Sequence, residues 1–170
     1  NEEIIFLATF DYLTGAFNRG SFIQKLKAEI ERTHLGKTTT SLLLIDIDFF
    51  KQINDQHGHL GGDIILKHFT ECAQSRLRSH DFLGRLGGDE FVVCLADTVL
   101  SEAADIAEQL RTAVEELNIF YNSALIRFTV SIGVAQYKLE MGTDTNAFIS
   151  KADEYLYRAK ANRNCIVSEG

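Results

Sequence analysis

The stretch "GRLGGDEFVVCLADT", residues 84–98, holds a glycine pair followed by two acidic residues and an apolar run. A glycine pair between β-prone segments predicts a tight hairpin turn. Strands joined by so short a turn must be antiparallel, so an all-parallel sheet is excluded. The two acidic residues, Asp89 and Glu90, either decorate this turn or are held by it for a chemical purpose.

Helical and extended patterns alternate along the rest of the chain. Amphipathic spacing predicts helices, with Ser101 as a candidate N-cap, and β-prone runs predict strands. The predicted helices span residues 21–34, 63–78, 101–118 and 145–162, and the predicted strands outside the hairpin span residues 40–50, 124–137 and 165–168. We therefore predict an α+β fold with a mixed, mainly antiparallel central sheet flanked by helices.

Length and composition narrow the classes of protein further. A chain of 170 residues that is 45% hydrophobic suits one globular domain, and its net charge of -7 argues against a broad electrostatic contact with nucleic acid or membrane. Three widely spaced cysteines indicate reduced thiols and a cytoplasmic protein, and no apolar run reaches the ~20 residues of a membrane span. Residues 1–10 look like the end of an upstream linker helix, so we expect the domain to occupy residues 11–170.

Two further acidic residues end the apolar strand at residues 40–50. Asp46 and Asp48 are two positions apart and share one face of the strand, where an unpaired carboxylate costs several kcal/mol to bury. One alternative is that one of them caps the following turn while the other is solvated. If this strand neighbours the hairpin, carboxylates from both segments converge and repel each other. A divalent cation such as Mg²⁺ or Mn²⁺ would relieve that repulsion, and the glycine pair would let a ligand approach the backbone.

Six stretches resemble, in the correct order, motifs of the diguanylate cyclase (GGDEF) family. They are "DYLTGAFNR" at 11–19, "DIDFFKQIND" at 46–55, "GHLGGD" at 58–63, "GGDEF" at 87–91, "SIGVA" at 131–135 and "ADEYLYRAK" at 152–160. The resemblance implies a fold similar to the palm of polymerases and class III nucleotide cyclases. It also implies a reaction that condenses two GTP into cyclic di-GMP and two pyrophosphates, with one GTP held by each of two facing domains.

The same resemblance implies the metal-binding and catalytic residues. Asp46, Asp89 and the carbonyl of Ile47 match the family's metal ligands, which implies two Mg²⁺ (or Mn²⁺) ions per active site. Asp89 would also lie near the 3′-hydroxyl of GTP and help to deprotonate it. Glu90 belongs to the same acidic turn and is needed in the family.

A second group of residues resembles the family's substrate site. Asn54 and Asp63 match the residues that read guanine, although Asn54 is also a typical turn former and Asp63 a typical helix N-cap. The other substrate-binding residues that the resemblance implies are Lys51, Phe49, Phe50, Gly87, Gly88, Lys160 and Arg163. The two lysines match cations that contact the terminal phosphates. The segment "AKANRN", residues 159–164, departs from the family because it lacks a glycine and brings Arg163 one position earlier.

Two shorter patterns allow a structural and a functional interpretation. Arg78 and Asp81, in "RSHD", are spaced as in a common surface ion pair, yet their position matches the family's product-inhibition motif. His57 and His59 invite a metal interpretation, but a third ligand at suitable spacing is missing, so a structural or hydrogen-bonding role is favoured.

Three classes of function compete for this pattern. An active cyclase is favoured over a silent nucleotide receptor because the acidic turn is intact, and a plain structural module leaves Asp46 unexplained. The expected partners are GTP, cyclic di-GMP and a second copy of the domain, without a nucleic acid polymer or direct membrane contact. The expected location is the cytoplasm, in the output domain of a longer sensory protein.

Overall fold

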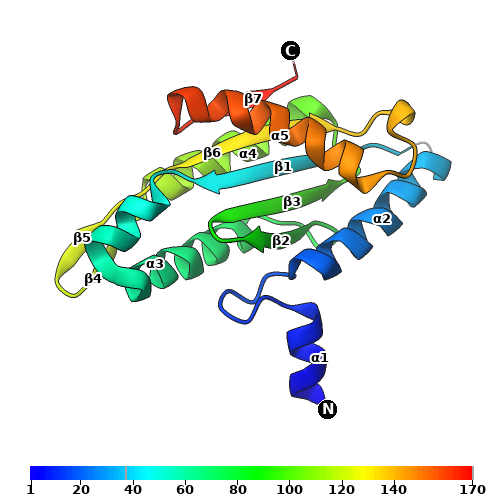
Figure 1. Ribbon diagram of the computed structural model, residues 1–170. Helices are drawn as coiled ribbons and strands as arrows, with labels where there is room; N and C mark the ends of the chain where they lie inside the picture. Colours follow the sequence, from blue (N-terminus) through cyan, green and yellow to red (C-terminus); the bar gives the residue numbers. More distant parts are fainter. Residues whose placement is uncertain (37, 170) are drawn as a thin grey trace.

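A five-stranded sheet forms the centre of the computed structural model, which describes residues 1–36 and 38–169 (Figure 1). The strand order is β2-β3-β1-β6-β7, with every pair antiparallel except β6 and β7. The strands are β1 (Thr40–Ile47), β2 (Phe82–Gly87), β3 (Glu90–Ala96), β6 (Val130–Gln136) and β7 (Ile166–Ser168). A separate two-stranded hairpin consists of β4 (Ile119–Tyr121) and β5 (Ala124–Ile126). The predicted mixed, mainly antiparallel sheet is confirmed.

Helices cover both faces of this sheet. The long helices are α2 (Arg19–Gly36), α3 (Phe50–Gln74), α4 (Leu100–Glu115) and α5 (Thr145–Asn162), and a 3₁₀ turn spans Leu139–Met141. α3 and α4 enclose one hydrophobic core against the sheet, and α2 and α5 enclose a second core on the opposite face. Because side chains alternate along a strand, the odd-numbered residues of β1 pack under α3 and α4 and its even-numbered residues face α2 and α5. This alternation places Asp46 and Asp48 on the α2–α5 side.

The first helix stands apart from these layers. α1 (Glu2–Thr9) extends away from the body of the domain (Figure 1), and no residue of α1 is buried. Its apolar side chains, Ile4, Ile5, Phe6 and Leu7, are between 45% and 66% exposed. Within the described ranges, none of the helices combines the length and apolar character that crossing a membrane requires.

Several boundaries differ from the sequence-based prediction, and the strand predicted at residues 40–50 ends at Ile47. α3 begins at Phe50 rather than after Gly62 and continues through a kink at Gly58, where φ is 77°. The predicted strand at 124–137 is divided into β5 and β6, because β5 turns back to pair with β4. The N-cap of α4 is Val99 and not Ser101, which lies inside the helix.

Candidate active site

The two acidic segments meet where β1 ends beside the β2–β3 turn. Asp46 lies opposite Glu90 in the antiparallel register, and the backbone N–H of Ile47 donates to the carbonyl of Asp89 at 3.2 Å. Gly88 and Asp89 form the turn itself, and Gly88 has a φ of 50°, which glycine adopts without steric cost. The turn therefore holds Asp89 beside the end of β1.

The carboxyl groups perturb one another at this turn. Burial, together with the adjacent carboxyl group of Asp46 and its charge, raises the pKa of Asp89 to about 7, although Lys160 offsets part of the effect. Burial and the charge of Asp46 also raise the pKa of Glu90. Carboxyl groups held this close favour a shared proton or a bound cation.

Asp46 has one paired and one unpaired oxygen. Its Oδ2 forms an ion pair with Nζ of Lys160, which extends from α5. Its Oδ1 is the only buried side-chain nitrogen or oxygen without a hydrogen-bond partner among the residues that the structure describes. Leaving such an oxygen unpaired costs about 1–3 kcal/mol or more. A hard divalent cation beside Asp46 and Asp89 would satisfy it, so the donor set fits Mg²⁺ or Mn²⁺.

An arginine clamp that sequence reasoning missed supports the turn. Arg85 in β2 donates from Nε and Nη2 to the carbonyl of Gly88 at 3.0 and 2.7 Å, and from Nη1 to the carboxylate of Asp11 at 3.2 Å. Burial alone would raise the pKa of Asp11, but hydrogen bonds from Thr14 and the Arg85 charge lower it overall. A polar residue in an otherwise apolar strand was the only signal in the sequence for this clamp.

Asn54 and Asp63 come together at the kink of α3. Both lie inside the helix, so the alternatives of a turn former and a helix N-cap are wrong. A Cβ atom built on Gly62 would lie 1.8 Å from Oδ1 of Asn54, so only glycine lets the Asn54 amide pack against the backbone next to Asp63. His57 packs in the same way against Gly61, where a Cβ would lie 2.6 Å from that of His57, and His59 is exposed.

The remaining substrate candidates surround the start of α3 and the end of α5. Lys51 is exposed in the first turn of α3, and Phe50 packs against the core. Phe49 precedes the helix with a φ of 55° and is 51% exposed. The guanidinium carbon of Arg163 lies 4.6 Å from the centre of the Phe49 ring. The backbone of Arg163 has a φ of 59°. Lys160 is thus beside the acidic turn, whereas Arg163 lies over Phe49.

Asp48 neither caps the following turn nor is solvated, the two alternatives that the sequence allowed. It is 2% exposed and neither solvated nor free, because its carboxylate accepts hydrogen bonds from Thr129, Ser131 and the backbone of Asn164. Although Asp46 and Asp48 share a face of the chain, only Asp46 reaches the acidic turn.

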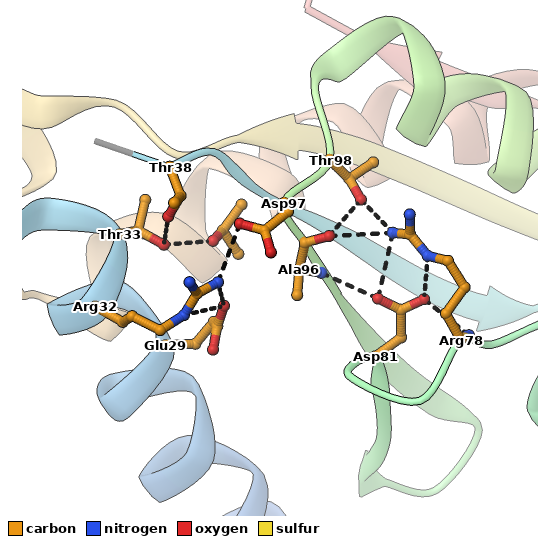
Figure 2. Close-up of polar contacts among 10 residues, drawn as sticks. Glu29, Arg32, Thr33, Thr38, Arg78, Asp81, Ala96, Asp97 and Thr98 are labelled. Carbon is orange, nitrogen blue, oxygen red and sulfur yellow. Dashed lines mark hydrogen bonds and ion pairs between the residues drawn. The ribbon is translucent and has the colours of Figure 1, made fainter. Parts of the chain in front are cut away.

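Arg78 and Asp81 form a pair after α3 that is also bound to the end of β3 (Figure 2). Arg78 donates from Nε to Asp81 at 3.0 Å and from Nη2 to the carbonyl of Ala96 at 3.1 Å, and the hydroxyl of Thr98 lies within hydrogen-bonding contact. Asp81 also accepts from the backbone N–H of Ala96 at 3.0 Å. These contacts hold the loop after α3 in place.

A cavity of about 560 Å³ lies beside Asp81. Its lining includes Phe17, Lys25, Arg32, His80, Asp81 and Phe82. Nζ of Lys25 lies 5.1 Å from the ring centres of both Phe17 and Phe82, and Arg32 extends from α2 toward the end of β3 (Figure 2). Glu29 and Asp97 also line the cavity, and both form ion pairs with Arg32, so aromatic rings, cations and carboxylates all border it. The cavity lies at the end of the β2–β3 hairpin opposite to the acidic turn.

The raised pKa of Asp89 predicts an unusual pH dependence of stability. Its pKa is about 7 in the folded chain against 3.8 for the ordinary group, so the folded state binds more protons between these values. The Asp89 contribution to stability therefore falls as the pH rises from about 4 to about 7. Mg²⁺ should stabilise the domain most above this window, where the carboxylate is charged. Thermal unfolding across this pH range, with and without Mg²⁺, measures both effects.

The matched control for this measurement is Asp89→Asn, which should lack both the pH-dependent loss and most of the Mg²⁺ effect. Equal stabilisation by Mg²⁺ at the two ends of the pH range in the unmodified domain would contradict the assignment of the cation site to Asp89.

Comparison with known proteins agrees with this geometry. The chain is 36% identical over 165 residues to diguanylate cyclase A of Treponema denticola and 41% identical over 166 residues to the response regulator PleD of Caulobacter vibrioides. These alignments cover 95% and 96% of this chain but only 44% and 36% of the relatives, so the chain spans less than half of either protein.

Solved structures show the same arrangement of helices and strands. The coiled coil and GGDEF domain of DgcB from Caulobacter crescentus, in complex with c-di-GMP, has a TM-score of 0.92 at 28% identity, with 99% of this chain and 89% of that chain covered. Diguanylate cyclase SiaD of Pseudomonas aeruginosa, in complex with its activator SiaC, has a TM-score of 0.91 at 32% identity, with 99% and 65% covered. The family model described as "Diguanylate cyclase, GGDEF domain" matches residues 8–165. The chain therefore belongs to the GGDEF domain family of diguanylate cyclases.

Proposed function

We propose that this domain is a diguanylate cyclase, which condenses two GTP molecules into cyclic di-GMP and releases two pyrophosphates. The observation that carries the proposal is the unpartnered buried oxygen of Asp46 beside Asp89, whose pKa is raised to about 7. Clusters of buried carboxyl groups with perturbed pKa values are typical of catalytic centres. Membership of the family supports the same conclusion, and the intact acidic turn favours catalysis over a receptor that only binds nucleotide.

The carboxylates of Asp46 and Asp89, with the carbonyl of Ile47, would hold Mg²⁺ or Mn²⁺, two ions in each active site. Bound there, the ions would stabilise negative charge on the attacking oxygen and on the phosphates. Asp89 would also lie near the 3′-hydroxyl of GTP and help to remove its proton, since a carboxylate can act as a general base. Glu90 adds negative charge beside it and helps to attract cations to the turn.

The kink of α3 would recognise guanine. The carboxylate of Asp63 can accept from the N1–H and the 2-amino group, and the amide of Asn54 can address O6 or N3. Adenine lacks those two donors on the matching edge, so it would leave the carboxylate unpaired. The packing of Asn54 against Gly62 keeps the amide in one place for this recognition.

Cations from two helices would bind the triphosphate. Lys160 already lies beside the acidic turn and would exchange part of its contact with Asp46 for phosphate oxygens. Lys51 is exposed in the first turn of α3, where free backbone N–H groups also favour anions. Phe49, Phe50, Gly87 and Gly88 provide the backbone that borders the nucleotide. Arg163, which follows α5, would contact the phosphates from the margin of this group.

Catalysis requires two facing domains, since each GTP must attack the other. We expect cyclic di-GMP to form from GTP and Mg²⁺, with a rate per domain that rises in proportion to protein concentration while pairing is weak. Chromatography of the products over a dilution series measures this dependence. A rate per domain that is constant on dilution contradicts weak pairing. Absence of product even after fusion to a dimerising coiled coil would leave the receptor as the function.

Arg78 and Asp81 would form part of a product-inhibition site together with the adjoining cavity. An Arg guanidinium can bind a guanine edge or a phosphate, and Asp81 would exchange its present contacts with Arg78 for donors of guanine. We expect Arg78→Ala to weaken binding of cyclic di-GMP by about 10-fold or more, because charged hydrogen bonds are lost. Calorimetry measures this, with the exposed Arg76→Ala as the control. Unchanged affinity in Arg78→Ala would place the product elsewhere.

The partners of the domain would be GTP, cyclic di-GMP and a second copy of itself. The exposed apolar side chains of α1 suit the end of a linker helix, and residues 11–170 would form the cyclase domain. We place the domain in the cytoplasm, because GTP is its proposed substrate.

A further inference from the structure

Asp48 joins the end of β1 to two other segments of the chain. Its Oδ2 accepts from the hydroxyl of Thr129 at 2.6 Å and from the backbone N–H of Asn164 at 2.8 Å. Its Oδ1 accepts from the hydroxyl of Ser131 at 2.6 Å and lies 3.7 Å from the guanidinium of Arg163. The carboxylate thus connects β1 to the start of β6 and to the turn that follows α5.

That turn is a strained part of the backbone. Arg163 and Asn164 have φ values of 59° and 45°, a region that costs a residue such as arginine about 1–3 kcal/mol and that asparagine tolerates better. Such a conformation persists only where surrounding contacts hold it. Asn164 is held by the Asp48 carboxylate at its backbone and by Arg111, at 2.8 Å, at its side chain. The Asn164 side chain also donates to Glu115, so Asp48 is one of several anchors of this turn.

The turn follows directly on the last residues of α5 and is hydrogen-bonded to them. The N–H of Arg163 closes the helix on the carbonyl of Ala159 at 2.8 Å, and Lys160 is the next residue after Ala159. Lys160 forms its ion pair with Asp46, two residues before Asp48 on the same face of the chain. Asp46 in β1 and Asp48, the residue after β1, therefore contact the end of α5 at two points, one through its lysine and one through its terminal turn.

We propose that Asp48 is a positioning residue for the phosphate-binding end of the site, which fixes the turn after α5 so that Lys160 and Arg163 are held toward the triphosphate. This inference rests on the proposed function, because it assigns those two cations to GTP. Asp48 itself touches no substrate, since its oxygens are occupied by the protein. A merely structural role would instead weaken the whole domain and all of its ligand contacts alike.

Comparing GTP with GMP separates the two roles. Both nucleotides present guanine and an α-phosphate, and only GTP presents the terminal phosphates that the two cations would contact. We expect Asp48→Ala to weaken GTP binding by about 10- to 100-fold, the loss that follows from displacing charged hydrogen bonds. GMP binding should change by less than about 3-fold. Calorimetry with the whole chain in the presence of Mg²⁺ measures both affinities, with a GTP analogue whose α–β phosphate bridge cannot be cleaved in place of GTP, because the unmodified domain would consume GTP itself.

Two variants complete the experiment. Asp48→Asn keeps an oxygen for the Asn164 N–H and should recover most of the lost GTP affinity, and it serves in place of Asp48→Ala if that variant does not fold. Asp48→Asn should still lose more affinity for GTP than for GMP, because the neutral amide no longer attracts the Arg163 guanidinium. The control is Ser41→Ala, which removes a buried hydrogen bond to the carbonyl of Thr98 from the other end of β1 and should leave the ratio unchanged.

The outcomes distinguish the inference from the function on which it rests. If the unmodified domain binds GTP but the Asp48 variants lose GTP and GMP affinity equally, or lose neither, the positioning role is wrong and the proposed function stands. If the unmodified domain binds GTP no more tightly than GMP, the assignment of Lys160 and Arg163 to the phosphates is wrong, and the positioning role with it.

Discussion

Replacing Asp89 by asparagine is expected to lower the rate of cyclic di-GMP formation by about 1,000-fold or more. The change removes a cation ligand and a group poised to accept a proton, and general-base catalysis alone contributes about 10²–10⁴-fold. The amide also lowers the affinity for Mg²⁺, because it removes one negative charge from the pair with Asp46. Quantifying product from GTP and Mg²⁺ at saturating protein concentration measures the loss.

The same substitution should stabilise the domain in the absence of metal. Asp89 is held beside Asp46 at the cost of a raised pKa, so removing its charge relieves repulsion above about pH 7. Lost activity together with a higher melting temperature would show that the Asp89 carboxylate destabilises the folded domain and is needed for activity. The control is Asp153→Asn, an exposed carboxylate of α5 near Glu90, which should retain most of the activity. More than about a tenth of normal activity in Asp89→Asn would contradict its catalytic role.

The second large effect concerns the choice of base. Asp63→Asn should weaken GTP binding by about 100-fold, since the amide can accept only one of the two guanine donors and places its own donor against the other. ITP lacks the 2-amino group, so the unmodified domain should prefer GTP to ITP and the variant should lose that preference. Competition binding with both nucleotides measures the ratio.

The matched control for the base preference is Asp55→Asn, an exposed carboxylate on the same helix. It should keep both the affinity and the preference for GTP. If Asp63→Asn still prefers GTP to ITP as strongly as the unmodified domain, then Asp63 does not read the guanine edge.

Long, strongly periodic segments were predicted well from the sequence. α5 spans Thr145–Asn162, as predicted, and the hairpin turn lies at the glycine pair. In both cases the signal is local: apolar spacing of about 3.6 residues in one, and a glycine turn between β-prone runs in the other. The first half of α3 was missed because three glycines interrupt its pattern, and Gly62 is present for its contact with Asn54 rather than for helix formation.

The β4–β5 hairpin was missed for another reason. Each strand has three residues, which is too short to show alternation, and its turn relies on Asn122 and Ser123 at φ values of 49° and 63° rather than on glycine. The Arg85 clamp was also invisible, because its partners are a distant carboxylate and a backbone carbonyl. Contacts of this kind depend on which segments the fold brings together.

The two aspartates at the end of β1 show most clearly what each level of structure decides. The sequence by itself determined that Asp46 and Asp48 share a face, because strand side chains alternate with a period of two, and that a second acidic pair follows a tight turn. Only the tertiary structure separated their roles. The hairpin turn brings Asp89 to Asp46, whereas β6 and the turn after α5 bring hydrogen-bond donors to Asp48. A carboxylate becomes reactive or structural according to the groups that replace its water, and those groups come from segments distant in the chain.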